Sequence, residues 1–409
     1  MKVVVVGSGG REHALASVMG RQHEVVVTPG SAGIPGSVAT SPEELDADLF
    51  VIGPEQPLVD GLADRLRAQG KVVFGPGADG AQLEGSKAWM KDLLVDAGVA
   101  TAAHKTFSAS QLDDALAHLE TMPGLYVIKT DGLAAGKGVV VTDSLDEARA
   151  TVRSYLSGEA FGDAGTTLVI EEGMTGPELS VFVACDGTNA VLFGTAQDHK
   201  RIGDGDTGPN TGGMGAYTPV PIAKPMIIDA VMEKAIGPTL RALRARGIEY
   251  RGFLYCGLML TEAGPKVVEY NIRFGDPEAQ AILPLLTSDL AKHLLEAASG
   301  RLRSTPSFAN EASVCVVLAS EGYPSAPRTG DVIQGIEAAR EVPDVEVFAA
   351  GVAAGDDGVL RTAGGRVLNV VGRGPDMAAA RKAAYAGAAE ISWPGLQLRT
   401  DIAASAMDA

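Results

Sequence analysis

Runs of consecutive apolar residues alternate with longer polar stretches through the first hundred residues of the chain. The four runs are KVVVVG (2–7), HEVVVTPG (23–30), DLFVIGPE (48–55) and KVVFGPG (71–77). Because they are short, continuous and rich in valine, they are typical of strands that are buried on both faces. Helices are expected between them, near 11–20 and 57–69. The pattern therefore predicts a parallel sheet covered by helices.

The pattern changes at Ser86. The segment SKAWMKDLLVDAG is expected to be an amphipathic helix that ends at Gly98. A small α+β unit follows, with strands at YVIK (126–129), GVVVT (138–142) and TTLVIEE (166–172) and a helix near 144–157. Longer strands then return at ELSVFVAC, NAVLFGTA, GFLYCGLML and PKVVEYN.

After Gly300 the pattern becomes one of short strands and Gly/Pro turns, with one helix near 376–390. These changes divide the chain into three regions, with breaks near residues 86 and 300. A chain of 409 residues is too long for one ordinary core, which agrees with several domains.

Composition and charge limit the classes of function. Apolar residues make up 46% of the chain and charged residues 21%, as in globular proteins. No apolar run approaches the roughly 18–20 residues that span a membrane, and the run Val3–Val6 is too short for a signal peptide. A net charge of −17 argues against nucleic-acid binding, although a few local cations suffice for a small phosphorylated substrate.

Three isolated cysteines, Cys185, Cys256 and Cys315, lie in apolar runs that are expected to be strands. We expect buried free thiols rather than a disulfide, a metal site or a nucleophile. Free thiols in turn indicate the cytoplasm as the compartment.

The opening GSGGREHAL resembles a dinucleotide-binding turn but lacks two of its features. Glu12 stands where a third glycine is needed, and the second strand ends in Thr28-Pro29-Gly30 rather than in an acid. Backbone N–H groups at such a turn, with Arg11 beside them, favour a phosphate monoester over a pyrophosphate. A tight turn with no ligand is an equally good interpretation of this stretch alone.

The stretch DGLAAGKGVVV (131–141) is not a P-loop, because its spacing is one residue short and a strand follows it. It is a glycine-rich hairpin carrying Lys137, with Lys129 at the end of the preceding strand. Such a flap can fold its amides over phosphates. The alternative is a flexible hairpin with solvated lysines, but a tip with few polar side chains favours the functional interpretation.

The stretch KVVEYNIRFGDPE (266–278) carries the highest density of functional groups. Glu269 and Asn271 are two apart on a strand, so their side chains project from one face. Carboxylate and amide oxygens suit Mg²⁺ that bridges to phosphates. An edge strand with its polar face in water is the alternative, but the Arg, Asp and Glu that follow at once are more than solvation requires.

Two further segments are candidates for substrate contact. IEEGMTGPE (170–178) ends a strand in Glu171-Glu172 and reaches Glu178, although acidic turns of this kind are common. QDHKRIGDGDTGPNTGGMGAY (197–217) joins four charged residues to a loop that is too glycine-rich to be rigid. We expect this loop to cover a substrate.

These motifs, in this order along essentially the whole chain, resemble the glycinamide ribonucleotide synthetase family of the ATP-grasp superfamily. The resemblance implies a multidomain α/β and α+β fold. Its parts are an N-terminal parallel-sheet (pre-ATP-grasp) domain at 1–86, an ATP-grasp domain at 87–300 with a mobile lid subdomain at about 106–175, and a small α/β C-terminal domain at 301–409.

The resemblance also implies roles for individual residues. The ATP contacts implied are Lys87, Lys129, Gly132, Gly136, Lys137, Gly138, Glu171, Glu172 and Glu178. The resemblance places the substrate phosphate at the opening loop and the sugar hydroxyls at Glu55. The substrate contacts that it implies are Gly9, Gly10, Arg11, Glu12, Glu55, Gly213, Asp276 and Glu278. Glu269 and Asn271 would hold Mg²⁺, with Mn²⁺ as an alternative ion. The catalytic candidates around glycine are Asp198, Lys200, Arg273 and Asp276.

The implied reaction joins glycine to 5-phosphoribosylamine in de novo purine biosynthesis. ATP would convert the glycine carboxylate into glycyl phosphate, the amine would attack it, and closed loops would exclude water. No nucleic acid, membrane or covalent nucleophile is implied, and a monomer or weak dimer is expected. The strand GFLYCGLML lacks the additional acid that many ATP-grasp enzymes carry there, which leaves the number of metal ions open.

Three other functions stay open at this point. Another ATP-grasp enzyme, such as a carboxyaminoimidazole ribonucleotide synthase or a D-alanine–D-alanine ligase, would share the nucleotide site. An NAD-dependent oxidoreductase is disfavoured by Glu12 and Thr28. A non-catalytic nucleotide-sensing module would keep the loops without turnover.

Overall fold

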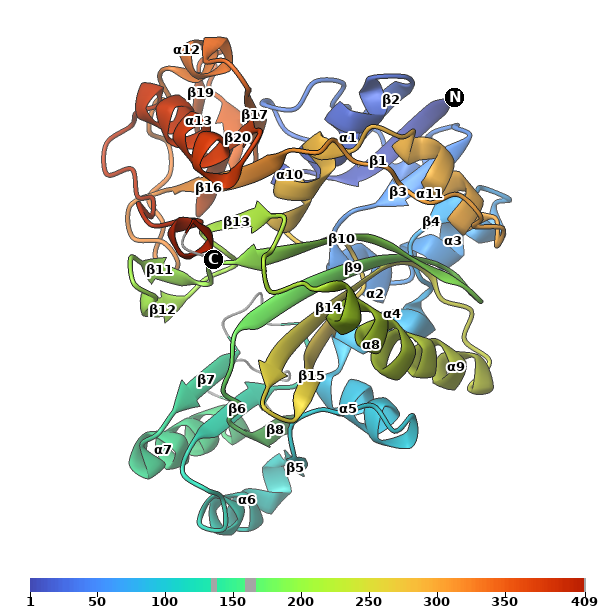
Figure 1. Ribbon diagram of the computed structural model, residues 1–409, viewed down its shortest axis with the longest axis vertical. Helices are drawn as coiled ribbons and strands as arrows, with labels where there is room; N and C mark the ends of the chain where they lie inside the picture. Colours follow the sequence, from blue (N-terminus) through green and yellow to red (C-terminus); the bar gives the residue numbers. More distant parts are fainter. Residues whose placement is uncertain (134–137, 159–166, 408–409) are drawn as a thin grey trace.

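Four parallel strands form the N-terminal sheet, with order β2-β1-β3-β4 (Figure 1). The computed structural model describes residues 1–133, 138–158 and 167–407. The strands are β1 (Lys2–Gly7), β2 (Glu24–Pro29), β3 (Leu49–Ile52) and β4 (Val73–Phe74). Val3–Val6 are all at most 4% exposed, so the predicted burial of this run on both faces is confirmed.

The helices of this first domain differ from the prediction at one place. Helix α1 (Gly10–Gly20) lies where a helix was expected. The single helix expected over 57–69 is instead two short ones, α2 (Glu55–Val59) and α3 (Leu62–Ala68). They are separated because Gly61 adopts φ +75°, a left-handed conformation that interrupts a helix.

A second, antiparallel sheet with order β5-β8-β6-β7 forms the small unit at the bottom of Figure 1. Its elements are β5 (His104–Ser108), α6 (Leu112–Leu119), β6 (Tyr126–Thr130), β7 (Val139–Thr142), α7 (Leu145–Leu156) and β8 (Thr167–Glu172). The unit has a hydrophobic core of its own, which includes Phe107, Ile128 and Val152.

The third sheet has eight strands in the order β15-β14-β9-β10-β13-β16-β20-β17. They are β9 (Glu178–Asp186), β10 (Ala190–Asp198), β13 (Gly215–Thr218), β14 (Arg251–Thr261), β15 (Gly264–Asn271), β16 (Ala312–Ala319), β17 (Val345–Ala349) and β20 (Arg366–Gly374). The last three belong to the expected C-terminal region, so one sheet continues past residue 300. Strand β13 makes the junction, and at Gly215 a Cβ would lie 2.6 Å from the Cys315 carbonyl oxygen.

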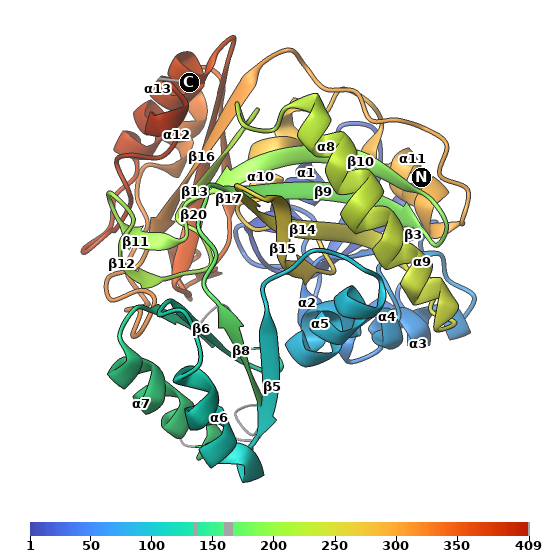
Figure 2. The same ribbon diagram turned by 60° about the horizontal axis from the view of Figure 1, so that its bottom comes forward.

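Helices cover this large sheet (Figure 2). They are α8 (Pro225–Val231), α9 (Gly237–Ala245), α10 (Glu278–Ile282), α11 (Leu290–Ala298) and α13 (Met377–Glu390). Helix α13 packs on β20 and β16 and confirms the helix expected near 376–390.

Two helices, α4 (Ala78–Gly85) and α5 (Lys87–Asp96), lead from the first domain to the small sheet. The Ser86 hydroxyl caps α5 by accepting from the Trp89 N–H at 3.1 Å. The helix stops before Gly98, which adopts φ +67° as the predicted terminator. The Val267 N–H then donates to the Ala100 carbonyl at 2.8 Å, so the small sheet begins beside β15.

The structure tests the expectations about the cysteines and about membrane-spanning helices. Cys185, Cys256 and Cys315 are all free and buried, as predicted, and burial raises the pKa of each thiol. Over the described ranges, no helix combines the length and apolarity that crossing a bilayer requires.

His13 joins the first domain to the C-terminal region. Its Nδ1 accepts a hydrogen bond from the Ala349 N–H of β17 at 2.8 Å, and its ring meets Phe348 edge-on. Burial, with Arg340 nearby, lowers the pKa of His13 to about 4. The imidazole is therefore neutral in the folded protein at neutral pH, as an acceptor at Nδ1 must be.

We predict that His13 contributes to loss of stability in acid. Because its pKa is lower in the folded state than in the unfolded state, the contribution is complete above pH 6.5 and is lost as the pH falls toward 4. The loss amounts to about 3 kcal/mol. Urea unfolding between pH 7.5 and 4.5 measures it, with His13→Asn as the comparison because the asparagine Oδ1 can replace Nδ1 without titrating. Equal pH dependence in both proteins would contradict the assignment.

Candidate active site

A cavity of about 760 Å³ lies between the small sheet and the eight-stranded sheet, and residues from all three regions line it. Most of the predicted site residues meet there. They are Arg11, Glu55, Lys87, Lys129, Gly132, Gly138, Glu171, Glu172, Glu178, Asp198, Lys200, Glu269, Asn271, Arg273, Asp276 and Glu278. Gly9, Gly10, Glu12 and Gly213 are not part of the lining, and Gly136 and Lys137 fall outside the described residues.

Lysines approach the cavity from the small sheet and from α5. Lys87 Nζ donates to the Gly132 carbonyl at 2.9 Å, at the start of the glycine-rich hairpin. Lys129 Nζ lies 3.0 Å from Glu171 Oε1 and donates to the Val268 carbonyl at 3.3 Å. Burial raises the pKa of the Glu171 carboxyl, but its lysine neighbours lower it more, so the carboxylate is ionised.

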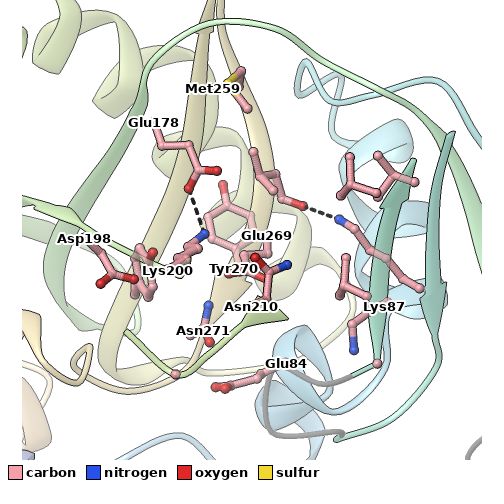
Figure 3. Close-up of a pocket in the computed structure, with 18 of the residues that line it drawn as sticks. Glu84, Lys87, Glu178, Asp198, Lys200, Asn210, Met259, Glu269, Tyr270 and Asn271 are labelled. Atoms are coloured by element: carbon pink, nitrogen blue, oxygen red, sulfur yellow. Dashed lines mark hydrogen bonds and ion pairs between the residues drawn. The ribbon is translucent and has the colours of Figure 1, made fainter. Parts of the chain in front are cut away.

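Glu269 and Asn271 lie at the end of β15, on the wall of the cavity (Figure 3). Asn271 Nδ2 is buried without a hydrogen-bond partner among the described residues. Burial raises the pKa of Glu269, but Lys200, Lys129, Lys87 and Arg273 lower it more. An ionised carboxylate beside an amide whose Oδ1 can also act as a ligand is a donor set that fits a hard divalent cation.

The described residues contain no group of three or more His, Cys, Asp and Glu side chains that could hold a metal ion. This agrees with the missing acid on β14, the strand GFLYCGLML. Any cation here would take the rest of its ligands from substrate phosphates and water.

The opening loop differs from the expected anion site. The Gly9 N–H donates to Glu12 Oε2 at 2.7 Å, so the glutamate that breaks the dinucleotide fingerprint folds back onto the start of α1. A Cβ at Gly7 or Gly53 would come within 2.4 Å or 2.1 Å of the Glu12 side chain. These glycines therefore make room for a buried acid, and the Gly9 amide is already used.

Arg11 and Arg273 form a chain of ion pairs with acids of the first domain. Arg11 Nε donates to Glu12 at 2.6 Å, and Arg273 Nε donates to Glu55 at 3.2 Å. Burial acts to raise the pKa of Glu55, but the positive charges of Arg273 and Arg11 outweigh this effect and lower the pKa to about 2. Glu84 of α4, which sequence reasoning missed, accepts from Arg273 Nη2 at 2.9 Å.

Acidic side chains crowd the opposite wall of the cavity. Lys200 Nζ lies 2.8 Å from Glu178 Oε2, an ion pair visible in Figure 3. Burial raises the pKa of both Asp198 and Glu278, and the negative charge of Glu278 adds to the effect on Asp198. Asp198 Oδ1 is buried without a hydrogen-bond partner, so it is suited to accept a proton or to meet an amine.

Arg366 is a second residue that sequence reasoning missed. From β20 of the C-terminal region its Nη1 donates to the carbonyls of Asp276 and Gly212, both at 2.6 Å. It also pairs with the Asp276 carboxylate at 3.4 Å. The C-terminal region thereby holds two loops of the site in place, and nothing in the local sequence signals this.

The predicted glycine-rich loop is in part a hairpin of β11 (Arg201–Gly203) and β12 (Thr207–Asn210). The tail of the chain clamps it. Arg399, which is 1% exposed, donates to Asp206 at 2.6 Å, and Asp401 accepts from the Gly205 N–H at 2.8 Å. Asn210 of this hairpin lines the cavity and is a further residue that the sequence did not single out.

We predict that Arg399→Met loosens this hairpin. The change removes the guanidinium that holds Asp206 and Asp401 together, at a cost of about 1–3 kcal/mol in the free energy of unfolding. Amide hydrogen exchange over residues 201–210 should become faster. Arg361→Met, which removes a surface pair with Asp357 and a long hydrogen bond to the Gly330 carbonyl, is the control and should change stability by less than about 0.5 kcal/mol. Unchanged exchange in Arg399→Met would refute the clamp.

Three family models together match most of the chain. They are described as phosphoribosylglycinamide synthetase N domain (residues 1–84), ATP-grasp (A) domain (residues 85–279) and C domain (residues 313–405).

Curated relatives and solved structures agree with these matches. Phosphoribosylamine–glycine ligases of Escherichia coli and Caulobacter vibrioides are 47% and 48% identical, over 98% of this chain and 98% and 97% of theirs. The crystal structure of phosphoribosylamine–glycine ligase from Thermotoga maritima is similar, with a TM-score of 0.87, 35% identity, and coverage of 98% of this chain and 100% of that one. A biotin carboxylase from Campylobacter jejuni shares the fold at 15% identity, with a TM-score of 0.70 and coverage of 100% of this chain and 95% of that one.

Proposed function

The chain belongs to the phosphoribosylglycinamide synthetase family, and from that premise we propose how its cavity carries out the family's reaction. It is an ATP-grasp ligase, a phosphoribosylamine–glycine ligase of purine biosynthesis. Our own proposal concerns the roles of the individual residues, the identity of the metal and the intermediate. The observation that carries it is that Glu269 and Asn271 line one cavity together with Lys87, Lys129 and Lys200.

The nucleotide occupies the space between the two sheets in this proposal. Lys87 and Lys129 contact its phosphates, as do Gly132 and Gly138; Gly136 and Lys137, which lie outside the described residues, are proposed as further phosphate contacts. Glu172 and the backbone beside Glu171 meet the adenine, and Glu178 meets the ribose. The Glu171 carboxylate itself is paired with Lys129, which supports a role in arranging the phosphate lysines as well.

As an ATP-grasp ligase the enzyme uses ATP and a divalent cation. We propose Mg²⁺, with Mn²⁺ able to replace it, held by Glu269 and Asn271. When bound, the cation neutralises charge on the transferring phosphoryl group. Lys87 and Lys129 also stabilise the negative charge of the phosphoryl group. They do so from fixed positions and need no reorganisation as the reaction proceeds.

The second half of the cavity would hold glycine and the amine. Lys200 and Arg273 orient the glycine carboxylate for phosphorylation to glycyl phosphate. The amine of 5-phosphoribosylamine then attacks the acyl carbon, phosphate leaves, and the amine gives up a proton. Asp198 is suited to take that proton, because burial raises its pKa and one of its oxygens has no partner among the described residues. Glu278 and Asp276 complete this wall.

The sugar phosphate is proposed to lie beside the opening loop. Arg11 and Glu55 line the cavity there, with Gly10 at the start of α1. Because Glu12 accepts from the Gly9 N–H, the phosphate has to meet Arg11 and the remaining amides or displace the Glu12 carboxylate. Gly213 stays a substrate contact in this proposal, through the loop that Arg366 holds.

Several coarser features of the proposal follow from the family rather than from the cavity. Glycine, 5-phosphoribosylamine and ATP are the ligands that the family's function gives. A monomer or weak dimer, the absence of nucleic-acid binding and the cytoplasm as compartment remain proposals. So do the boundaries 1–86, 87–300 and 301–409.

Phosphate release from ATP tests the proposed substrates. Release should require both glycine and 5-phosphoribosylamine, and bicarbonate or D-alanine should not replace glycine. Release that proceeds at full rate without glycine would favour another ATP-grasp enzyme. Binding of ATP with no release under any condition would favour a nucleotide-sensing module. Tight NADH binding seen by fluorescence would revive the oxidoreductase.

We predict that Glu269→Gln lowers turnover by roughly 100-fold or more, because the change removes the charged ligand of the cation. Raising the Mg²⁺ concentration should recover part of the loss. Glu262→Gln, on an exposed turn between β14 and β15, makes the same chemical change outside the cavity and should leave turnover unchanged. A normal rate in Glu269→Gln would overturn the metal assignment.

A further inference from the structure

Lys91 is a fully buried lysine that the proposed reaction does not use. It lies on α5, one turn after Lys87, and is 0% exposed. Unlike Lys87, it does not line the cavity. Its ammonium lies 2.9 Å from Glu171 Oε2 and donates to the Thr101 hydroxyl at 2.7 Å. Burying a charged lysine costs free energy unless its charge is compensated, so the groups that contact Lys91 indicate its role.

Glu171 is shared between two lysines. Lys91 takes one carboxylate oxygen, and Lys129 takes the other at 3.0 Å. The three side chains together carry a net charge of about +1, since two ammonium groups face one carboxylate. Lys129 and Glu171 line the cavity, whereas Lys91 lies behind them. The excess positive charge is therefore presented to the cavity.

We propose that Lys91 is a positioning residue that neutralises Glu171 and so keeps the charge of Lys129 available to the phosphates of a nucleotide. The inference rests on the proposed contact between Lys129 and those phosphates. Without Lys91, Lys129 and Glu171 would form a neutral pair, and the attraction for a polyphosphate would fall. Lys129 has three N–H donors, and its hydrogen bond to the Val268 carbonyl uses one of them, so donors remain for a phosphate oxygen beside the ion pair with Glu171.

The same three residues connect the small sheet to the body of the molecule. The Thr101 hydroxyl that accepts from Lys91 donates in turn to the Val267 carbonyl at 2.6 Å. Lys129 donates to the next carbonyl of β15, that of Val268. Lys91 thus sets the position of the phosphate lysine relative to the strand that carries the proposed metal ligands.

A purely structural role for Lys91 gives different expectations. Replacing a buried ion pair by apolar residues of similar volume is often neutral for stability. A structural defect would also weaken binding of every part of the nucleotide alike. The charge role predicts a loss that is confined to ligands with phosphates.

The test is Lys91→Met, with dissociation constants for ADP and adenosine measured by calorimetry. The constant for ADP should rise roughly tenfold, which corresponds to about 1.4 kcal/mol. The constant for adenosine should change less than about twofold, and KM for ATP should rise more than kcat falls. Lys105→Met is the matched control, because it removes an exposed lysine of β5 away from the cavity, and it should leave the ADP constant unchanged.

The double variant Lys91→Met with Glu171→Gln provides the sharper comparison. It returns the net charge of the cluster to about +1, so ADP affinity should recover in part relative to Lys91→Met alone. Should Lys91→Met fail to fold, Lys91→Gln carries the same expectation, since it also removes the charge.

Two results would overturn the inference. One is wild-type ADP affinity in Lys91→Met, and the other is an equal loss for ADP and adenosine with no recovery in the double variant. Lys129→Met separates this failure from that of the proposed function. If Lys129→Met also binds ADP normally, the phosphate role of Lys129 is wrong, whereas a loss in Lys129→Met alone removes only the role of Lys91.

Discussion

A charged side chain taken out of water needs a partner of opposite charge, and this requirement organises the centre of the molecule. The cavity is lined by many ionisable groups, and their partners come from distant parts of the chain. Arg273 of the central region pairs with Glu55 and Glu84 of the first domain. Arg366 of the C-terminal region pairs with Asp276. The ion pairs therefore hold the domains together at the site where they meet.

The same requirement separates groups that support the site from groups that are available to a ligand. Lys91 is held by Glu171 and Thr101 and does not line the cavity, so it belongs to the supporting groups. Glu269 and Asn271, in contrast, line the cavity, and Asn271 Nδ2 is buried without a hydrogen-bond partner among the described residues. Asp198 Oδ1 is likewise buried without a partner among the described residues, so these three side chains are available to a ligand.

Sequence reasoning named segments that the structure brings together around one cavity, but it did not foresee how some of their groups pair. The opening glycines were expected to leave their amides free, whereas Glu12 accepts from the Gly9 N–H. Lys91 carried one signal, its spacing of four residues from Lys87 on a predicted helix, which puts both on one face. Arg366 and Arg399 carried none, since Asp276 lies 90 residues from Arg366 and Asp206 lies 193 residues from Arg399 in the chain.

By itself, the sequence determined the succession of strands and helices, the buried cysteines and the family, because hydrophobic periodicity and ordered motifs are local properties. It also determined that Glu269 and Asn271 share a face, since alternate residues of a strand do so. Only the tertiary structure decided that one sheet runs through the central and C-terminal regions, and which charges neutralise each other. Pairing depends on distances of a few ångströms between residues far apart in the chain, and no local pattern encodes those distances.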